Sequence, residues 1–189
     1  MNRRAATGLI CLLALAGFVW AIVSTEWWKT RRHFAAVSAE VASSPELLLY
    51  EGLPHKKVDG DDFRSEVHTK PTIKIQKHFF YEQPLDVPPE AVASLRALCA
   101  AADSFRSWSP GKECMGFHPD FALQWSNSDS TVWFLICFGC FEMQIDSPRG
   151  RLMMDLTDHK AFLRILKPLR RERPVAGYDV LLGPPPGKD

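Results

Sequence analysis

The sequence has almost no net charge and lacks the short motifs that identify the commonest enzyme classes. Its 189 residues contain 23 Lys+Arg and 22 Asp+Glu, a formal charge of +1. Nucleic-acid binding usually requires a basic excess, so we predict no nucleic-acid partner. The chain has no nucleophile elbow (G-x-S-x-G), P-loop, dinucleotide fingerprint (G-x-G-x-x-G) or H-E-x-x-H zinc motif. No function can therefore be assigned from these motifs.

Long apolar runs are also scarce, and the one that matters here lies near the start of the chain. Residues 1–33 hold five basic residues and one acid, a net charge of +4, whereas residues 34–189 hold 18 basic and 21 acidic residues, a net charge of −3. Residues 5–25 carry no charge, and Trp27 and Trp28 follow them. About 20 apolar residues span a bilayer, and tryptophan is typical of its headgroup level. We predict a single transmembrane helix over residues 8–25.

A cleaved signal peptide is the alternative, with Val19-Trp20-Ala21 as the cleavage site and a secreted product. Lys and Arg are nearly balanced on the two flanks, so the positive-inside rule does not settle the orientation. Because the segment also resembles an export signal, we favour an extracytoplasmic domain.

The rest of the chain predicts one α+β domain. We divide the sequence into four parts: an anchor or signal peptide (1–33), a helical stalk (34–49), the domain (50–174) and a Pro-rich tail (175–189). The domain is predicted to contain an antiparallel sheet of about five strands and two packing helices. Residues 51–70 are predicted to form a loop.

Alternation of apolar and polar residues locates the strands. The predicted strands cover residues 72–77, 121–125, 131–138, 140–146 and 152–156. Residues 131–138 are apolar throughout, which is typical of a strand covered on both faces. In the next strand Met143 and Ile145 are predicted to point inward, and Glu142 outward. The two helices are predicted to begin near Pro88 and Thr157.

Three cysteines and one histidine form the one group of residues whose spacing indicates metal binding or disulfide formation. Cys114 and His118 have the spacing C-x3-H, and Cys137 and Cys140 have the spacing C-x2-C. These four side chains are candidate zinc ligands, since tetrahedral zinc sites use such spacings. Alternatively the cysteines form disulfides, because Cys137 and Cys140 could face each other across a hairpin and Cys114 could pair with either. The third alternative is inert buried thiols. Asp120 and Glu142 are candidate supporting residues.

The other polar groups give weaker signals. Four histidines stand among polar residues and are predicted to be solvated: His55, His68, His78 and His159. The basic residues that end the last helix are predicted to complement its dipole or to bind an anionic partner. They are Lys167, Arg170, Arg171 and Arg173.

Four segments resemble a group of uncharacterised bacterial proteins, of the kind found in planctomycete-type bacteria. The segments are LYEGLPH (49–55), KPT (70–72), CMGFHPDFALQW (114–125) and ICFGCFE (136–142). The resemblance covers most of residues 48–174 and implies a small exported or membrane-anchored protein of the bacterial envelope. With the predicted anchor we expect the protein in the bacterial inner membrane. It also implies that six positions form the signature: Cys114, His118, Asp120, Cys137, Cys140 and Glu142. The chain departs from the group at Met115, where a glycine is expected.

We therefore predict a membrane-anchored, extracytoplasmic binding or structural domain, stabilised by its cysteine-histidine cluster through a disulfide or a structural zinc. The alternative is a metal- or thiol-dependent enzyme that uses the same cluster, with Glu142 as acid and base. We favour the non-enzymatic hypothesis, because no set of catalytic bases accompanies the cysteines.

Overall fold

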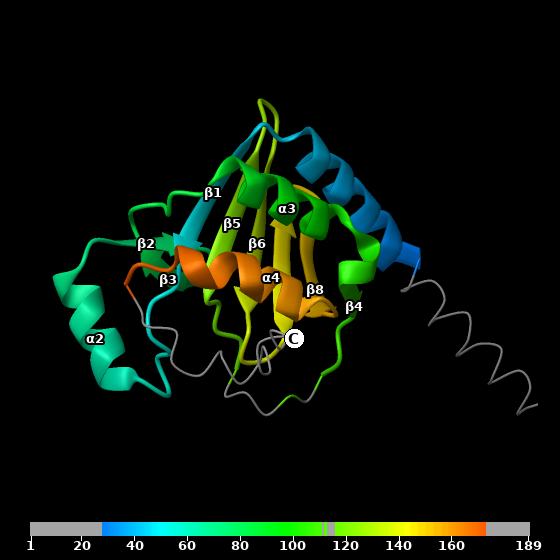
Figure 1. The fold of residues 1–189 in the computed structure, drawn as a ribbon. Helices are drawn as coiled ribbons and strands as arrows, with labels where there is room; N and C mark the ends of the chain where they lie inside the picture. The colour runs from blue at the N-terminus through cyan, green and yellow to red at the C-terminus, as the bar shows by residue number, and fades with distance from the viewer. Residues whose placement is uncertain (1–27, 111, 113–115, 173–189) are drawn as a thin grey trace, which may run out of the picture.

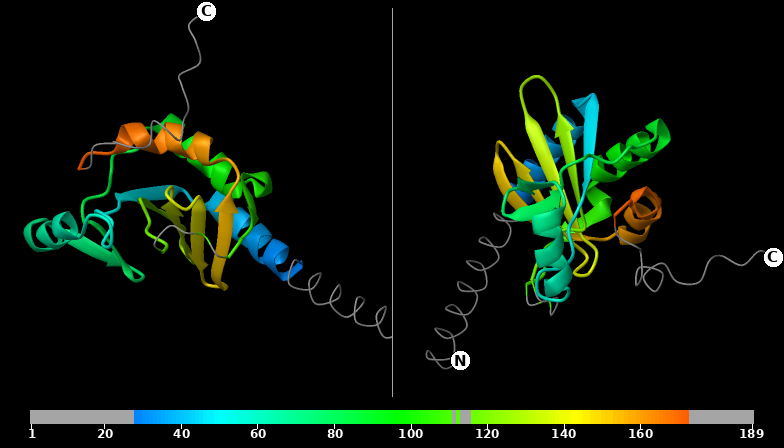
Figure 2. Two further views of the ribbon diagram at one scale, coloured as in Figure 1. Left: turned by 90° about the horizontal axis from the view of Figure 1, so that it is seen from below. Right: turned by 90° about the vertical axis from the view of Figure 1, so that its left-hand side faces the viewer.

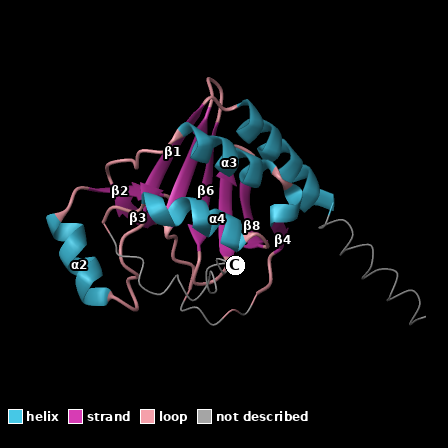
Figure 3. Cartoon of the chain, in the orientation of Figure 1, coloured by secondary structure: helices cyan, strands magenta, loops and turns pink. Residues whose placement is uncertain are grey.

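A six-stranded antiparallel sheet organises the fold (Figures 1 and 3). The computed structural model describes residues 28–110, 112 and 116–172. The sheet consists of β1 (Glu46–Glu51), β4 (Phe105–Ser107), β5 (Phe121–Ser126), β6 (Thr131–Cys137), β7 (Glu142–Ser147) and β8 (Gly150–Leu156). Its spatial order is β1-β5-β6-β7-β8-β4. The predicted α+β class is confirmed, with six strands in place of about five.

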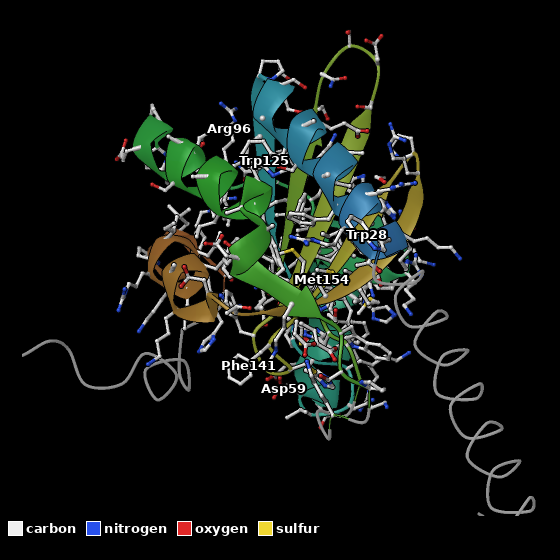
Figure 4. The ribbon with its side chains drawn as sticks, turned by 90° about the vertical axis from the view of Figure 1, so that its right-hand side faces the viewer. Trp28, Asp59, Arg96, Trp125, Phe141 and Met154 are labelled. Atoms are coloured by element: carbon white, nitrogen blue, oxygen red, sulfur yellow. The ribbon has the colours of Figure 1, made fainter. Side chains whose placement is uncertain are left out.

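Two helices, α3 (Pro89–Ala100) and α4 (His159–Leu166), pack against one face of the sheet (Figures 1 and 2). Short 3-10 turns follow them, η1 (Ala102–Ser104) and η2 (Lys167–Leu169). Pro89 begins α3 as predicted, because proline at the first helical position costs no hydrogen bond. Arg96 of α3 lies over the Trp125 ring of β5, 5.2 Å from its centre (Figure 4).

Strand β6 is central, and its two faces contribute to different apolar clusters. Val132, Phe134 and Ile136 join the main core with residues of α3 and α4. Leu135 joins a smaller cluster on the opposite face, with Tyr50 and residues of a separate hairpin. The prediction of a strand covered on both sides is therefore confirmed.

That hairpin consists of β2 (Thr72–Ile75) and β3 (His78–Tyr81). It replaces the single strand predicted over residues 72–77, because Gln76 adopts a φ of 56° and the chain reverses there. Just before it, α2 (Gly60–Thr69) occupies part of the predicted loop. No residue of α2 is buried, so its sequence lacks the apolar stripe by which helices are recognised.

Residues 34–49 do not form the single helical stalk that the sequence suggested. A helix described from residue 28 extends to residue 43, and β1 begins at Glu46. Phe34, Val37 and Val41 of this helix are buried in the main core. The segment thus contributes both a helix and an edge strand to the folded domain.

The predicted anchor (8–25) and the whole of the predicted tail (175–189) lie outside the described residues. Among the helices that the structure describes, none combines the length and the apolar stretch needed to cross a bilayer.

Candidate functional site

Three separate segments meet at Gly52, just after β1. The Gly52 N–H donates to the Asp120 carbonyl over 2.9 Å, and Gly52 also forms a bridge with Phe80 of β3. A Cβ atom at position 52 would lie 2.2 Å from the Pro119 carbonyl oxygen. Glycine is therefore required here, because any side chain would push residues 119–120 away from the end of β1.

A cavity of about 410 Å³ lies at this junction. It is lined by the segment after β1, by α2, by the β2–β3 hairpin and by the segment that precedes β5. The lining residues are His55, Lys56, Lys57, Phe63, Lys77, His78, Phe79, Gly116, Phe117, His118 and Pro119. Three of them are histidines and three are lysines, and none is an acid. Two of the histidines, His55 and His78, were predicted to be solvated, and here they meet His118 in one site.

His55 is held in one orientation by the turn that follows it. Its Nδ1 accepts hydrogen bonds from the backbone N–H groups of Lys57 and Val58, each over 3.1 Å. An imidazole that accepts at Nδ1 carries its proton at Nε2, so the ring of His55 is a donor at that atom. The rings of His55 and His118 are in contact, with centres 4.6 Å apart.

His78 is half-buried, and its Nε2 has no hydrogen-bond partner in the described part of the chain. Its ring contacts Phe117 edge-on, with centres 5.5 Å apart. Burial, with smaller contributions from the positive charges of Lys77 and His118, lowers the pKa of His78 to about 4. His78 is therefore neutral at neutral pH and adds no positive charge to the cavity.

We expect acid to destabilise the fold through His78. Its unfolded-state pKa is about 6.5, so on acidification the unfolded chain binds the proton first. This contribution to stability is complete above about pH 6.5 and is lost as the pH falls towards about 4. Burial also lowers the pKa of His159, which adds to the effect. We expect urea unfolding to show a loss of up to about 3 kcal/mol across this window. His78→Gln should flatten the pH dependence, and His68→Gln on exposed α2 should leave it unchanged.

Of the three cysteines that the structure describes, Cys140 is bonded, and Cys99 and Cys137 are free. Cys140 is disulfide-bonded, and its partner lies outside the described residues. Cys137 is a free, buried thiol, which corrects the predicted Cys137–Cys140 pair. Burial raises the pKa of Cys137 to about 11, although the backbone N–H groups of His118 and Cys140 donate to its sulfur. A thiol with this pKa is protonated at neutral pH and inert.

The predicted zinc site is not assembled among these residues. A sulfur in a disulfide is not a thiolate, so Cys140 does not offer the ligand that zinc prefers. The described residues contain no group of three or more His, Cys, Asp or Glu side chains arranged to hold a metal ion. Cys114 lies outside them, so its role as a metal ligand stays a prediction.

Asp120 holds the segment before β5 to two other elements. Its Oδ2 accepts from the backbone N–H of Phe138 over 2.8 Å, and its Oδ1 is 3.1 Å from the guanidinium of Arg170. Both side chains of this ion pair are buried, and Arg170 also lies over the Phe121 ring. Arg170 therefore anchors the described residues that follow α4 and does not form part of a solvated basic face.

Glu142 is buried, contrary to the prediction that it points to solvent. Its carboxylate accepts from Trp108 Nε1 over 2.9 Å and lies 3.3 Å from Lys112 Nζ. Lys112 also contacts Asp155, which faces Glu142 on the neighbouring strand. The side chain does point away from the main core, but the connection between β4 and β5 covers that face of the sheet. Period-2 alternation assigns a face and carries no information about what covers it.

Comparison of the chain with models of known protein families, with curated proteins and with solved structures finds no match.

Proposed function

We propose that this chain is a membrane-anchored, extracytoplasmic binding domain that holds a small anionic ligand in the cavity between His55, His78 and His118. One observation carries the proposal. Three lysines and three histidines line this cavity without a single carboxylate, although residues 34–189 carry a net charge of −3. In an acidic domain such a local excess of positive charge favours an anion.

The disulfide at Cys140 supports the proposed location, because disulfides persist mainly outside the cytoplasm. The anchor would be residues 8–25 in the inner membrane of a bacterium, as the sequence and its resemblance imply.

The alternative of a thiol-dependent enzyme has less support, since Cys140 is oxidised and Cys137 is buried with a raised pKa.

A larger cavity of about 520 Å³ lies between the N-terminal helix and β4. Arg31 and Arg106 are its only charged lining residues, and small or apolar side chains such as Ala35, Phe34 and Met154 supply most of the rest. It therefore lacks the converging polar groups that fix a ligand's orientation.

Anion binding can be tested by titrating the full chain, purified in a mild detergent, with inorganic phosphate. We expect saturable heat of binding that weakens with added salt. The double variant Lys57→Ala/Lys77→Ala should weaken binding about tenfold, since two charge-assisted contacts are removed.

The matched control is Lys74→Ala/Lys160→Ala, which removes the same charge from two exposed lysines outside the cavity. Equal weakening by both pairs would mean that phosphate responds only to the overall charge. That result, or no binding by the unaltered chain, contradicts the proposal.

A further inference from the structure

The cavity is larger than a simple inorganic anion requires. At about 410 Å³ it lies within the range of pockets that enclose small organic ligands. One water molecule occupies about 30 Å³ of liquid, and a tetrahedral anion is only a few times larger. A bound inorganic anion would leave most of the space to water, so the volume indicates a ligand with an organic body.

The walls indicate what kind of body it is. Phe63 of α2, Phe79 of β3 and Phe117 from the segment before β5 all line the cavity. Phe63 meets Phe79 edge-on, with ring centres 6.0 Å apart and an angle of 74° between the planes. The three rings are only half-buried, so part of their apolar surface stays hydrated when the cavity is empty. Covering it with a planar ring would gain about 25 cal/mol for each Å² buried, plus an aromatic contact energy.

The lysines of the cavity come from the segment after β1 and from the β2–β3 hairpin. Lys57 Nζ lies close to Gly116, 3.8 Å from where a Cβ atom on that residue would be placed. Lys77 stands in the hairpin turn directly before His78, and the fixed ring of His55 offers an N–H donor at Nε2. Several cationic and neutral donors around one anion match a phosphate dianion, with three terminal oxygens, better than a carboxylate with two.

We propose that the ligand is an aromatic phosphate monoester, with its phosphate among the lysines and histidines and its ring against the three phenylalanines. This inference rests on the anion-binding function proposed above and adds the class of ligand. The binding is non-covalent, and no bond of the ligand is broken.

Phenyl phosphate is the probe that distinguishes a site for an aromatic phosphate from a site for any small anion. We expect the full chain in detergent to bind phenyl phosphate at least tenfold more tightly than inorganic phosphate, and to bind benzoate more weakly than phenyl phosphate. Phenol, which has the ring without the dianion, should not bind measurably. Phe117→Leu keeps an apolar wall but removes an aromatic face, so it should weaken the binding of phenyl phosphate more than the binding of inorganic phosphate.

Phe141→Leu is the matched control, because Phe141 is a half-buried ring outside the cavity that contacts His159. Inorganic phosphate that binds as tightly as phenyl phosphate would overturn the ligand class and leave the anion site standing. The same holds if benzoate binds better than phenyl phosphate, or if Phe141→Leu acts like Phe117→Leu. If neither phosphate binds, the proposed function itself is wrong.

Discussion

Replacing Arg170 by methionine is expected to lower the free energy of unfolding by about 3–5 kcal/mol. The side chains of Arg170 and Asp120 are 3% and 8% exposed, so neither charge is solvated when the other is removed. Methionine retains most of the apolar packing on the Phe121 ring but leaves the Asp120 carboxylate buried without its guanidinium. The loss should be measured by urea unfolding and as a decrease in the thermal midpoint.

A double-mutant cycle with Asp120→Asn isolates the interaction between the two side chains. Asparagine can still accept from the Phe138 N–H, so the single variant tests the charge more than the hydrogen bond. In the double variant no unpaired charge remains, and we expect it to be more stable than Arg170→Met alone. Arg64→Ala is the control, because the Arg64–Asp61 pair is 69% and 96% exposed and exposed pairs contribute about 0–1 kcal/mol.

If Arg170→Met lowers the free energy of unfolding as little as Arg64→Ala does, the buried Arg170–Asp120 ion pair does not stabilise the fold as proposed.

This ion pair also matters for the site, because Asp120 directly follows His118 and Pro119 in the cavity wall. Variants of the pair should therefore weaken phosphate binding even under conditions where the domain remains folded.

The elements that the sequence predicted correctly are those whose pattern is local. Strands β5 to β8 follow one another with short turns, and each carries its own signal, which is apolar alternation in β5, β7 and β8 and an apolar run in β6. Pro89 at the start of α3, and the apolar positions Phe162 and Leu166 of α4, belong to the same kind of signal. Local signals of this kind need no knowledge of the partner strand.

The elements that differed depend on contacts between residues distant in the chain. Residues 46–51 form a strand because they pair with β5, about 75 positions later in the sequence. Their apolar run Leu47–Leu49 is compatible with a helix, and nothing nearby in the sequence shows that an edge of the sheet is open. Helix α2 buries no residue, so it had no apolar stripe to detect.

The candidate site was predicted only in part for the same reason. His118, Asp120, Cys137 and Cys140 lie close together, because residues 118–120 adjoin the end of β6. His55 and His78 were missed, since they come from segments that join this site only through Gly52 and the β2–β3 hairpin. The nearest signal was the segment LYEGLPH itself, which ends at His55.

Removing the disulfide is the other change with a large expected effect. We expect Cys140→Ala to lower the free energy of unfolding by about 2–4 kcal/mol, because the unfolded chain then regains the freedom that the cross-link removed. Dithiothreitol should lower the thermal midpoint of the unaltered chain by a similar amount and should not affect Cys140→Ala. Cys137→Ala removes only a buried thiol, so it should cost less and should keep the full sensitivity to the reductant.

The partner of Cys140 can be identified in the same experiment. Cys99 and Cys137 are free, so the sequence leaves Cys11 and Cys114. We expect Cys114, because the Gly116 carbonyl lies 3.9 Å from Cys140 Sγ and Gly116 is only two residues further along the chain. Cys114→Ala should then reproduce Cys140→Ala, whereas Cys11→Ala should behave like the unaltered chain. If Cys140→Ala, Cys114→Ala and Cys11→Ala all keep the decrease of the thermal midpoint in dithiothreitol, Cys140 does not form a disulfide. If cells contain Cys140 only as a thiol, the extracytoplasmic location would be contradicted as well, because the periplasm oxidises such pairs.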